Sequence, residues 1–80
     1  MNMTDIAEFF DYIRAFCNTY FVDVDISVNP ESLYIYMHRD NTHIKKILPF
    51  SELQSLNISY GDVIKSTLGS LLEAIDEVEG

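Results

Sequence analysis

Hydrophobic residues recur along this chain with a helical period, then a strand period, and then a helical period again. Over residues 5–20 the interval is three or four residues, which is typical of an amphipathic helix. Thr4 or Asp5 is predicted to cap the start of this helix, with Glu8 reaching back to the cap. The apolar positions of the helix are Ile6, Phe9, Phe10, Ile13, Phe16, Cys17 and Tyr20.

Three strands are predicted between residues 22 and 48, where apolar and polar residues alternate. The first strand covers residues 22–28, and the sequence Asn-Pro-Glu-Ser at 29–32 predicts a turn after it. The second strand runs from Leu33 to Arg39, and a tight turn is expected at residues 40–41. The third strand covers residues 42–48 and alternates less cleanly than the other two.

Lys45 and Lys46 are neighbours in the third strand, so one of them must lean toward the covered face of the sheet. Such a charge commonly protects an edge strand from pairing with another chain. Pro49 is expected to end the strand, because proline cannot donate a hydrogen bond to a neighbouring strand. Residues 51–56 then predict a short helical turn. This turn is expected to pack Phe50, Leu53 and Leu56.

A second long helix is predicted to begin after Ser59, with Asp62 in its first turn, and to extend to about Val78. Gly69 lies in the middle of this helix, where glycine lowers stability by about 1 kcal/mol relative to alanine. A close approach of the sheet or of the first helix would explain it. The apolar stripe of this helix comprises Ile64, Leu68, Leu71, Leu72, Ile75 and Val78, with Val63 at its margin.

These elements predict an α+β fold and a single domain, residues 1–80. Two apolar helix stripes and one apolar sheet face make a two-layer sandwich in the order helix, three-stranded antiparallel sheet, short helical turn, helix. Both long helices are expected on one face of the sheet. The other face is left open, and a binding site is expected there.

Counting outward from the two turns predicts which side chains share the open face of the sheet. Aromatic, partly polar patches of this kind are favoured at partner-binding surfaces. The alternative is purely structural, since tyrosine is a good strand former and an open antiparallel face is often mixed. The predicted residues are Asp23, Asp25, Ser27, Tyr34, Tyr36, His38, His43, Lys45 and Ile47.

Asp23, His38 and His43 have side chains of the types that bind zinc and similar ions. Cross-strand charge pairing explains the three residues equally well. The sequence therefore assigns no metal and no cofactor, and a small metal-binding regulator is kept as a third hypothesis.

The chain is strongly acidic, with 13 acidic and five basic residues and a formal net charge of −8. Such a charge repels nucleic acid and anionic membranes, and attracts basic proteins. It also keeps a small protein soluble, which is the simpler explanation. Three acids, Glu73, Asp76 and Glu77, form a row at the end of the last helix, where the helix dipole favours cations. That row is either functional or part of a frayed, solvated end.

No catalytic motif is present: the sequence lacks a glycine-rich phosphate loop and a nucleophile elbow. Cys17 is the single cysteine, which suggests a reducing compartment. The first residues do not resemble a signal peptide, and no apolar run approaches the roughly 20 residues of a membrane span. We therefore expect a cytoplasmic protein that is not an enzyme.

The order of helices and strands resembles that of the double-stranded-RNA-binding domain. In that family, basic residues near the start of the second helix meet phosphates. The matching positions here are Ser59 to Asp62 and Lys65, which hold one lysine beside an aspartate. The resemblance therefore implies the topology but not RNA binding.

In size, acidity and architecture the chain is similar to small phage-encoded inhibitors of CRISPR nucleases and restriction enzymes. This similarity implies an acidic protein-binding module that inhibits or modulates a basic, nucleic-acid-handling protein. A homo-oligomeric structural or accessory protein, pairing through the Tyr34 and Tyr36 face or through an edge strand, is the alternative. The predicted partner-binding residues are Asp23, Asp25, Tyr34, Tyr36, His38, Glu73, Asp76 and Glu77.

Overall fold

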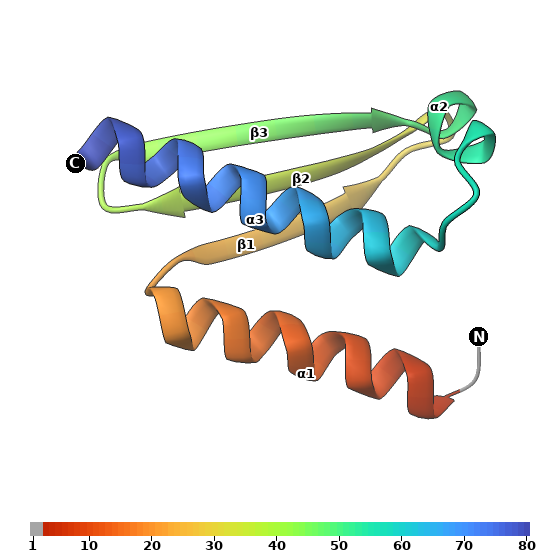
Figure 1. Ribbon diagram of the computed structural model, residues 1–80, viewed down its shortest axis with the longest axis horizontal. Coiled ribbons are helices and arrows are strands. Elements are labelled where there is room, and N and C mark those ends of the chain that lie inside the picture. Colours follow the sequence, from red (N-terminus) through yellow and green to blue (C-terminus); the bar gives the residue numbers. More distant parts are fainter. Residues whose placement is uncertain (1–2) are drawn as a thin grey trace.

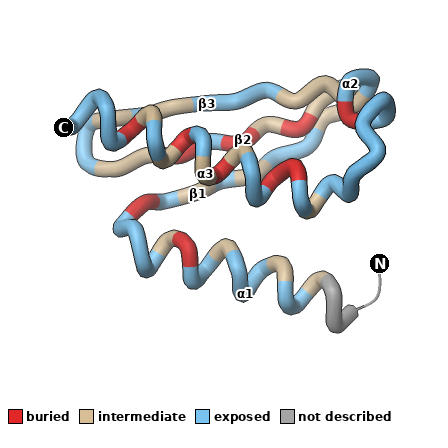
Figure 2. The backbone as a smooth tube through the Cα atoms, viewed as in Figure 1, coloured by how far each residue is buried: buried red, intermediate tan, exposed pale blue. Residues whose placement is uncertain are grey.

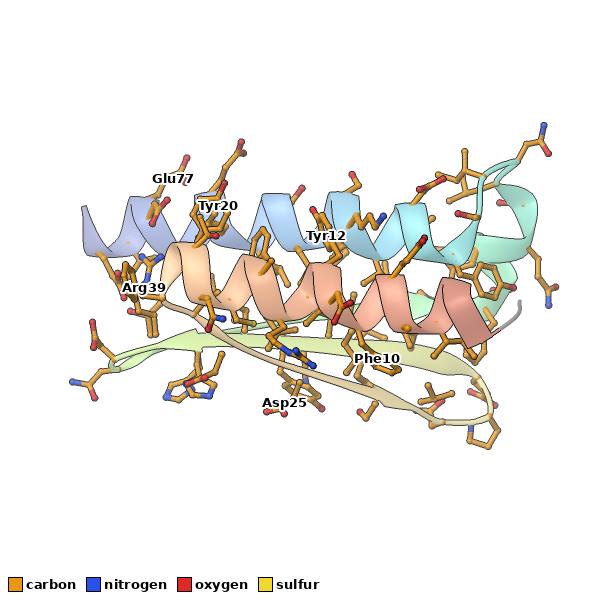
Figure 3. The ribbon with its side chains drawn as sticks, turned by 90° about the horizontal axis from the view of Figure 1, so that it is seen from below. Phe10, Tyr12, Tyr20, Asp25, Arg39 and Glu77 are labelled. Atoms are coloured by element: carbon orange, nitrogen blue, oxygen red, sulfur yellow. The ribbon has the colours of Figure 1, made fainter. Side chains whose placement is uncertain are left out.

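Antiparallel pairing through two short turns builds a three-stranded sheet, and two long helices lie on one side of it (Figures 1 and 3). The structure is a computed structural model that describes residues 3–80, with side chains from Ile6 onward. This confirms the predicted α+β fold. The elements in chain order are α1 (Met3–Tyr20), β1 (Asp23–Val28), β2 (Ser32–Arg39), β3 (Thr42–Pro49), α2 (Phe50–Ser55) and α3 (Tyr60–Glu79).

The sheet has the strand order β1-β2-β3 and the predicted register. In the first turn, the side-chain Oδ1 of Asn29 accepts hydrogen bonds from the backbone amides of Glu31 at 2.8 Å and Ser32 at 2.7 Å. The second turn has two residues and begins at Asp40, whose φ of 53° is positive. Aspartate tolerates this conformation better than most residues, so both turns favour the observed register through local chemistry.

The apolar face of α3 packs over β2 and β3 and forms the core with the covered face of the sheet. Ser59 caps α3 as predicted, because its Oγ accepts a hydrogen bond from the amide of Asp62 at 3.1 Å. Val63, predicted at the margin of the stripe, is buried. The core cluster consists of Phe16, Val22, Leu33, Ile35, Met37, Ile64, Leu68, Leu71 and Ile75.

Helix α1 is much less buried than its apolar stripe predicted (Figure 2). It runs in the same direction as α3 but lies beside β1, at the edge of the sheet (Figure 1). Phe16 is its one buried residue among those described from Ile6 onward, whereas Phe10 is 59% exposed and Tyr20 is 44% exposed. The stripe was correctly located, but the sheet is too narrow to cover all of it. The predicted cap at Thr4 or Asp5 involves side chains outside the described residues.

Two smaller predictions are wrong. Leu56 was expected to pack with the short helix, but it is 48% exposed, and Leu53 alone of the three residues is fully buried there. Gly69 was expected to allow a close approach of another element. A Cβ built at Gly69 meets no heavy atom of another element within 4 Å, so the packing does not explain the glycine.

Candidate binding surfaces

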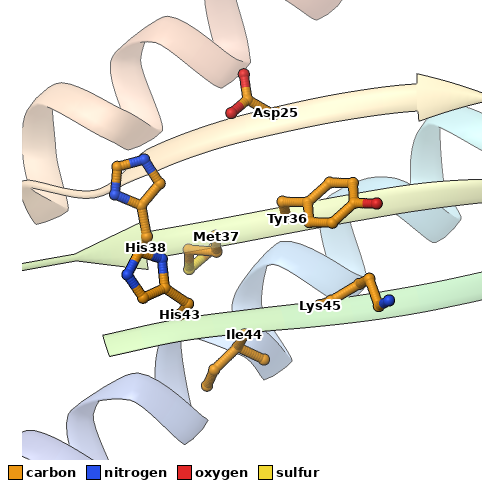
Figure 4. A pocket seen from close by; sticks show the side chains of 7 residues that line it. All are labelled: Asp25, Tyr36, Met37, His38, His43, Ile44 and Lys45. Carbon is orange, nitrogen blue, oxygen red and sulfur yellow. The ribbon is translucent and has the colours of Figure 1, made fainter. Parts of the chain in front are cut away.

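The open sheet face is formed by the side chains of β1, β2 and β3 that point away from the helices. Its residues lie in three rows across the strands: Asp23, His38 and His43; Asp25, Tyr36 and Lys45; and Ser27, Tyr34 and Ile47. The structure therefore brings together five of the predicted binding residues. Figure 4 shows the second row and the two histidines of the first row from close by.

Aromatic rings occupy the middle of the open sheet face, with charges on both sides. The rings of Tyr34 and Tyr36 are stacked, with centroids 6.3 Å apart, and Lys45 Nζ lies 6.0 Å from the centroid of the Tyr36 ring. Asp25 faces Tyr36 from the opposite strand. A shallow depression of about 420 Å³ lies over Asp25, Tyr36, Lys45 and the two histidines. Such an arrangement suits contact with a protein surface, because the rings supply apolar area and the charges supply orientation.

The two histidines do not complete a metal centre. Asp23 Oδ2 lies 3.6 Å from His38 Nε2, and the His38 and His43 rings stack with centroids 5.4 Å apart. Among residues 6–80 no group of three or more histidine, cysteine, aspartate or glutamate side chains is arranged to hold a metal ion. The third hypothesis therefore has no support in the described part of the chain.

The predicted acidic row on α3 does not join the open sheet face. Asp25 projects from the open side of the sheet, whereas Glu77 lies on the helical side of the molecule (Figure 3). Glu73 and Glu77 are exposed, but Asp76 is bonded to Arg39. The eight predicted residues are thus divided between two surfaces that face in opposite directions.

Arg39 at the end of β2 ties together the ends of both long helices, a role that the sequence did not reveal. Its Nη1 donates to Asp76 Oδ1 at 2.8 Å and to Glu79 Oε2 at 3.0 Å. Its Nε and Nη2 donate to the carbonyl oxygens of Phe21 and Tyr20. The hydrogen bonds that Arg39 donates to Asp76 and, to a lesser extent, to Glu79 raise the pKa of Arg39 above its ordinary value. The guanidinium of Arg39 therefore interacts with the C-termini of both α1 and α3. Its positive charge explains why Asp76 and Glu79 are tolerated at the end of α3.

The end of α1 is unusual in its own right. Phe21 has a φ of 55°, in the left-handed region, and the amide of Val22 donates to the carbonyl of Cys17 at 3.3 Å. This is the bonding pattern of a helix end that normally contains glycine at the position of Phe21. The Phe21 ring is 81% exposed. Arg39 stabilises this turn by binding the carbonyls of Tyr20 and Phe21.

A second surface, on the side of the helices away from the sheet, was missed by sequence reasoning. We call it the helical surface. Tyr12, Phe16 and Tyr20 form a column on α1, with centroids 6.3 Å and 4.8 Å apart. Lys65 of α3 lies with its Nζ 4.7 Å from the Tyr12 ring. Figure 3 shows Tyr12 and Tyr20 on the same side of the molecule as Glu77. The spacing of four residues between the three aromatics was a visible signal, but only Phe16 and Tyr20 were included in the predicted apolar stripe.

The charge of the molecule is segregated between its two layers. Helices α1 and α3 contain eight acidic and two basic residues, whereas the three strands contain two acidic and three basic residues. Among the described side chains, Glu73 and Glu77 have no lysine or arginine partner within 4.0 Å. Most of the acidic residues that composition revealed therefore lie on the two long helices.

In comparisons with known proteins, no family model, no curated protein and no solved structure matches the chain. None of the helices in residues 3–80 combines the length and the apolar character that a membrane crossing requires. The charges and shapes of the two surfaces are the observations that bear on function.

Proposed function

We propose that this chain is an acidic protein-binding module that inhibits or modulates a basic, nucleic-acid-handling protein through its helical surface. The observation that carries this proposal is the segregation of charge, with eight acids against two bases in α1 and α3. A positively charged partner is steered more strongly toward that layer than toward the open sheet face.

Exposed aromatic residues on the helical surface supply the contact area that charge alone does not provide. Tyr12 is 38% exposed and Tyr20 is 44% exposed, and Phe16 supports both rings from below. Tyrosine is enriched among the residues that dominate binding energy at interfaces, because its ring is rigid and its hydroxyl is polar. Acids around such rings fit a partner whose surface carries lysine and arginine.

Glu73 and Glu77 are two carboxylates of α3 that are available to such a partner. They are one helical turn apart on α3, about 6 Å along its axis, and both are exposed. Asp76 and Glu79 are already bonded to Arg39 and are less available. Surfaces that bind nucleic acids are rich in lysine and arginine, so two unpaired carboxylates can occupy sites that otherwise meet phosphates. Direct binding of nucleic acid is not expected from a chain of charge −8.

The proposal is tested by a charge reversal with a matched control. The Glu73→Lys/Glu77→Lys variant changes two unpaired acids of α3, and Glu31→Lys/Glu52→Lys makes the same change of net charge away from both long helices. The three proteins are used to capture partners from an extract of the native cells at about 50 mM and about 300 mM salt. The affinity for the captured protein is then measured by titration.

We expect wild type and the Glu31/Glu52 variant to retain a basic protein at the lower salt concentration, and the Glu73/Glu77 variant to lose it. A nucleic acid that competes with the module for that protein would support the proposed inhibition. The proposal is wrong if both variants bind equally well, or if both lose the partner, since then the position of the acids would not matter. A cytoplasmic location is part of the proposal, because Cys17 is a free thiol.

A further inference from the structure

The open sheet face has an order of charges that makes it complementary to itself. Reading across the strands, the row at Asp25 continues through Tyr36 to Lys45 (Figure 4). The row at Asp23 continues through His38 to His43. Each row is acidic on β1, aromatic on β2 and basic or titratable on β3. A surface ordered in this way matches a copy of itself that is turned so that β1 meets β3.

We propose that the open sheet face packs against the same face of a second copy. The two copies are related by a twofold axis that lies between the two faces and is parallel to β2. That rotation places β1 of one copy over β3 of the other and leaves β2 over β2. Asp25 then faces Lys45 of the second copy, twice by symmetry, and Tyr36 faces Tyr36 near the axis. Two sheets packed with their strands nearly aligned, about 10 Å apart, have this relation.

The other face-to-face arrangement is disfavoured by charge. A twofold axis perpendicular to the strands places β1 over β1, so that Asp23 and Asp25 meet the aspartates of the second copy. It also places Lys45 near Lys45. Like charges in contact at an interface oppose association, so the order of charges selects the first arrangement.

The charge of the rest of the molecule favours the same pairing. The helical surfaces repel one another, because each pair of long helices contains eight acids and two bases. The open sheet face contains two acids, Asp23 and Asp25, and one base, Lys45, so it is much less negative than the long helices and is the side through which two copies can approach. In the resulting dimer the two helical surfaces point outward in opposite directions. The inference is therefore independent of the proposed function, whose surface stays accessible.

The size of the face predicts a weak dimer. Three strands about 4.8 Å apart and six residues long give a flat footprint of about 14 Å by 20 Å, or roughly 300 Å². Stable interfaces bury about 800 Å² per partner, so we expect a dissociation constant in the micromolar range or weaker. Exposed Ile47 on β3, 43% accessible, adds apolar area within the face.

The test exchanges the charges of one row. Sedimentation is measured from about 10 μM to about 1 mM for wild type, Asp25→Lys, Lys45→Asp and the double variant Asp25→Lys/Lys45→Asp. We expect each single variant to dimerise about tenfold more weakly, because two contacts per dimer become repulsive. The double variant, and an equimolar mixture of the two single variants, should recover the wild-type dimer. Lys46→Asp, which changes charge at the neighbouring position on the other face, is the matched control and should dimerise like wild type.

A second measurement does not depend on variants. Dilution of labelled wild-type protein should shift the amide resonances of the open sheet face and leave those of α3 unchanged. A wild-type chain that stays monomeric at the highest concentration overturns the inference. The inference is also overturned if the double variant dimerises as weakly as the single variants, or if Lys46→Asp weakens the dimer as much as they do. Binding of the basic partner by Glu73 and Glu77 is measured separately, so failure of the dimer and failure of the proposed function are told apart.

Discussion

Replacing Gly69 by alanine should stabilise this protein, because nothing in the packing requires a glycine there. Gly69 lies inside α3, its φ is not positive, and a Cβ at this position meets no heavy atom of another element within 4 Å. Glycine costs about 0.8–1.0 kcal/mol relative to alanine in a helix interior, through the greater freedom of the unfolded chain. The added methyl group gains little contact of its own, so the expected gain in the free energy of unfolding is about 1 kcal/mol and not more.

Thermal and urea unfolding followed by circular dichroism measure this gain. For a domain of this length, an unfolding entropy near 2 cal/mol/K per residue converts about 1 kcal/mol into a rise in Tm of about 6 °C. Ser70→Ala is the control, because Ser70 is exposed on the same helix and its change should be smaller. An unchanged or lower Tm for Gly69→Ala would refute the reasoning, since it would mean that the backbone at Gly69 is not an ordinary helix interior.

Arg39→Met should lower the Tm and reduce the hydrogen-exchange protection of the last turn of α3, because Asp76 and Glu79 lose their shared cation; unchanged protection would show that the contacts contribute nothing. Burial is the largest influence on the thiol of Cys17 and raises its pKa above the ordinary value of 9.0, against a lowering by the backbone of Val24. The folded protein thus holds this proton more tightly than the unfolded chain, so the thiol's contribution to stability is complete below pH 9.0 and declines as the pH rises through the higher folded-state pKa. Alkylation by iodoacetamide near pH 8 should accordingly be slower in the native protein than in concentrated urea, and equal rates would contradict the assignment.

The sheet could be predicted in detail because its information is local. The alternation of apolar and polar residues indicates which side chains share a face of the sheet. The turn residues at 29–32 and 40–41 determine where one strand ends and the next begins. Asn29 uses its own side chain to hold the first turn. Counting residues outward from these two turns predicted the side chains of the open sheet face. They include Asp25 beside Tyr36 and Lys45.

The arrangement of the helices required the tertiary structure. A helical stripe shows which side of a helix is apolar, but not how much of that side a neighbouring element covers. The sheet has three strands, and α3 occupies β2 and β3, so α1 lies at the edge and leaves Tyr12 and Tyr20 accessible. An exposed aromatic surface therefore exists on α1, formed by Tyr12, which lay outside the predicted stripe, and by Tyr20, which the stripe included.

Sequence by itself determined the elements, their order, the register of the sheet and the total charge of this protein, because each depends on neighbouring residues or on composition. Only the tertiary structure decided which charges lie together. Arg39 meets Asp76 and Glu79, 37 and 40 positions away, and Glu77 of α3 lies on the side of the molecule opposite Asp25 (Figure 3). Such long-range contacts depend on how whole elements pack, and the spacing of residues along the chain does not record that packing.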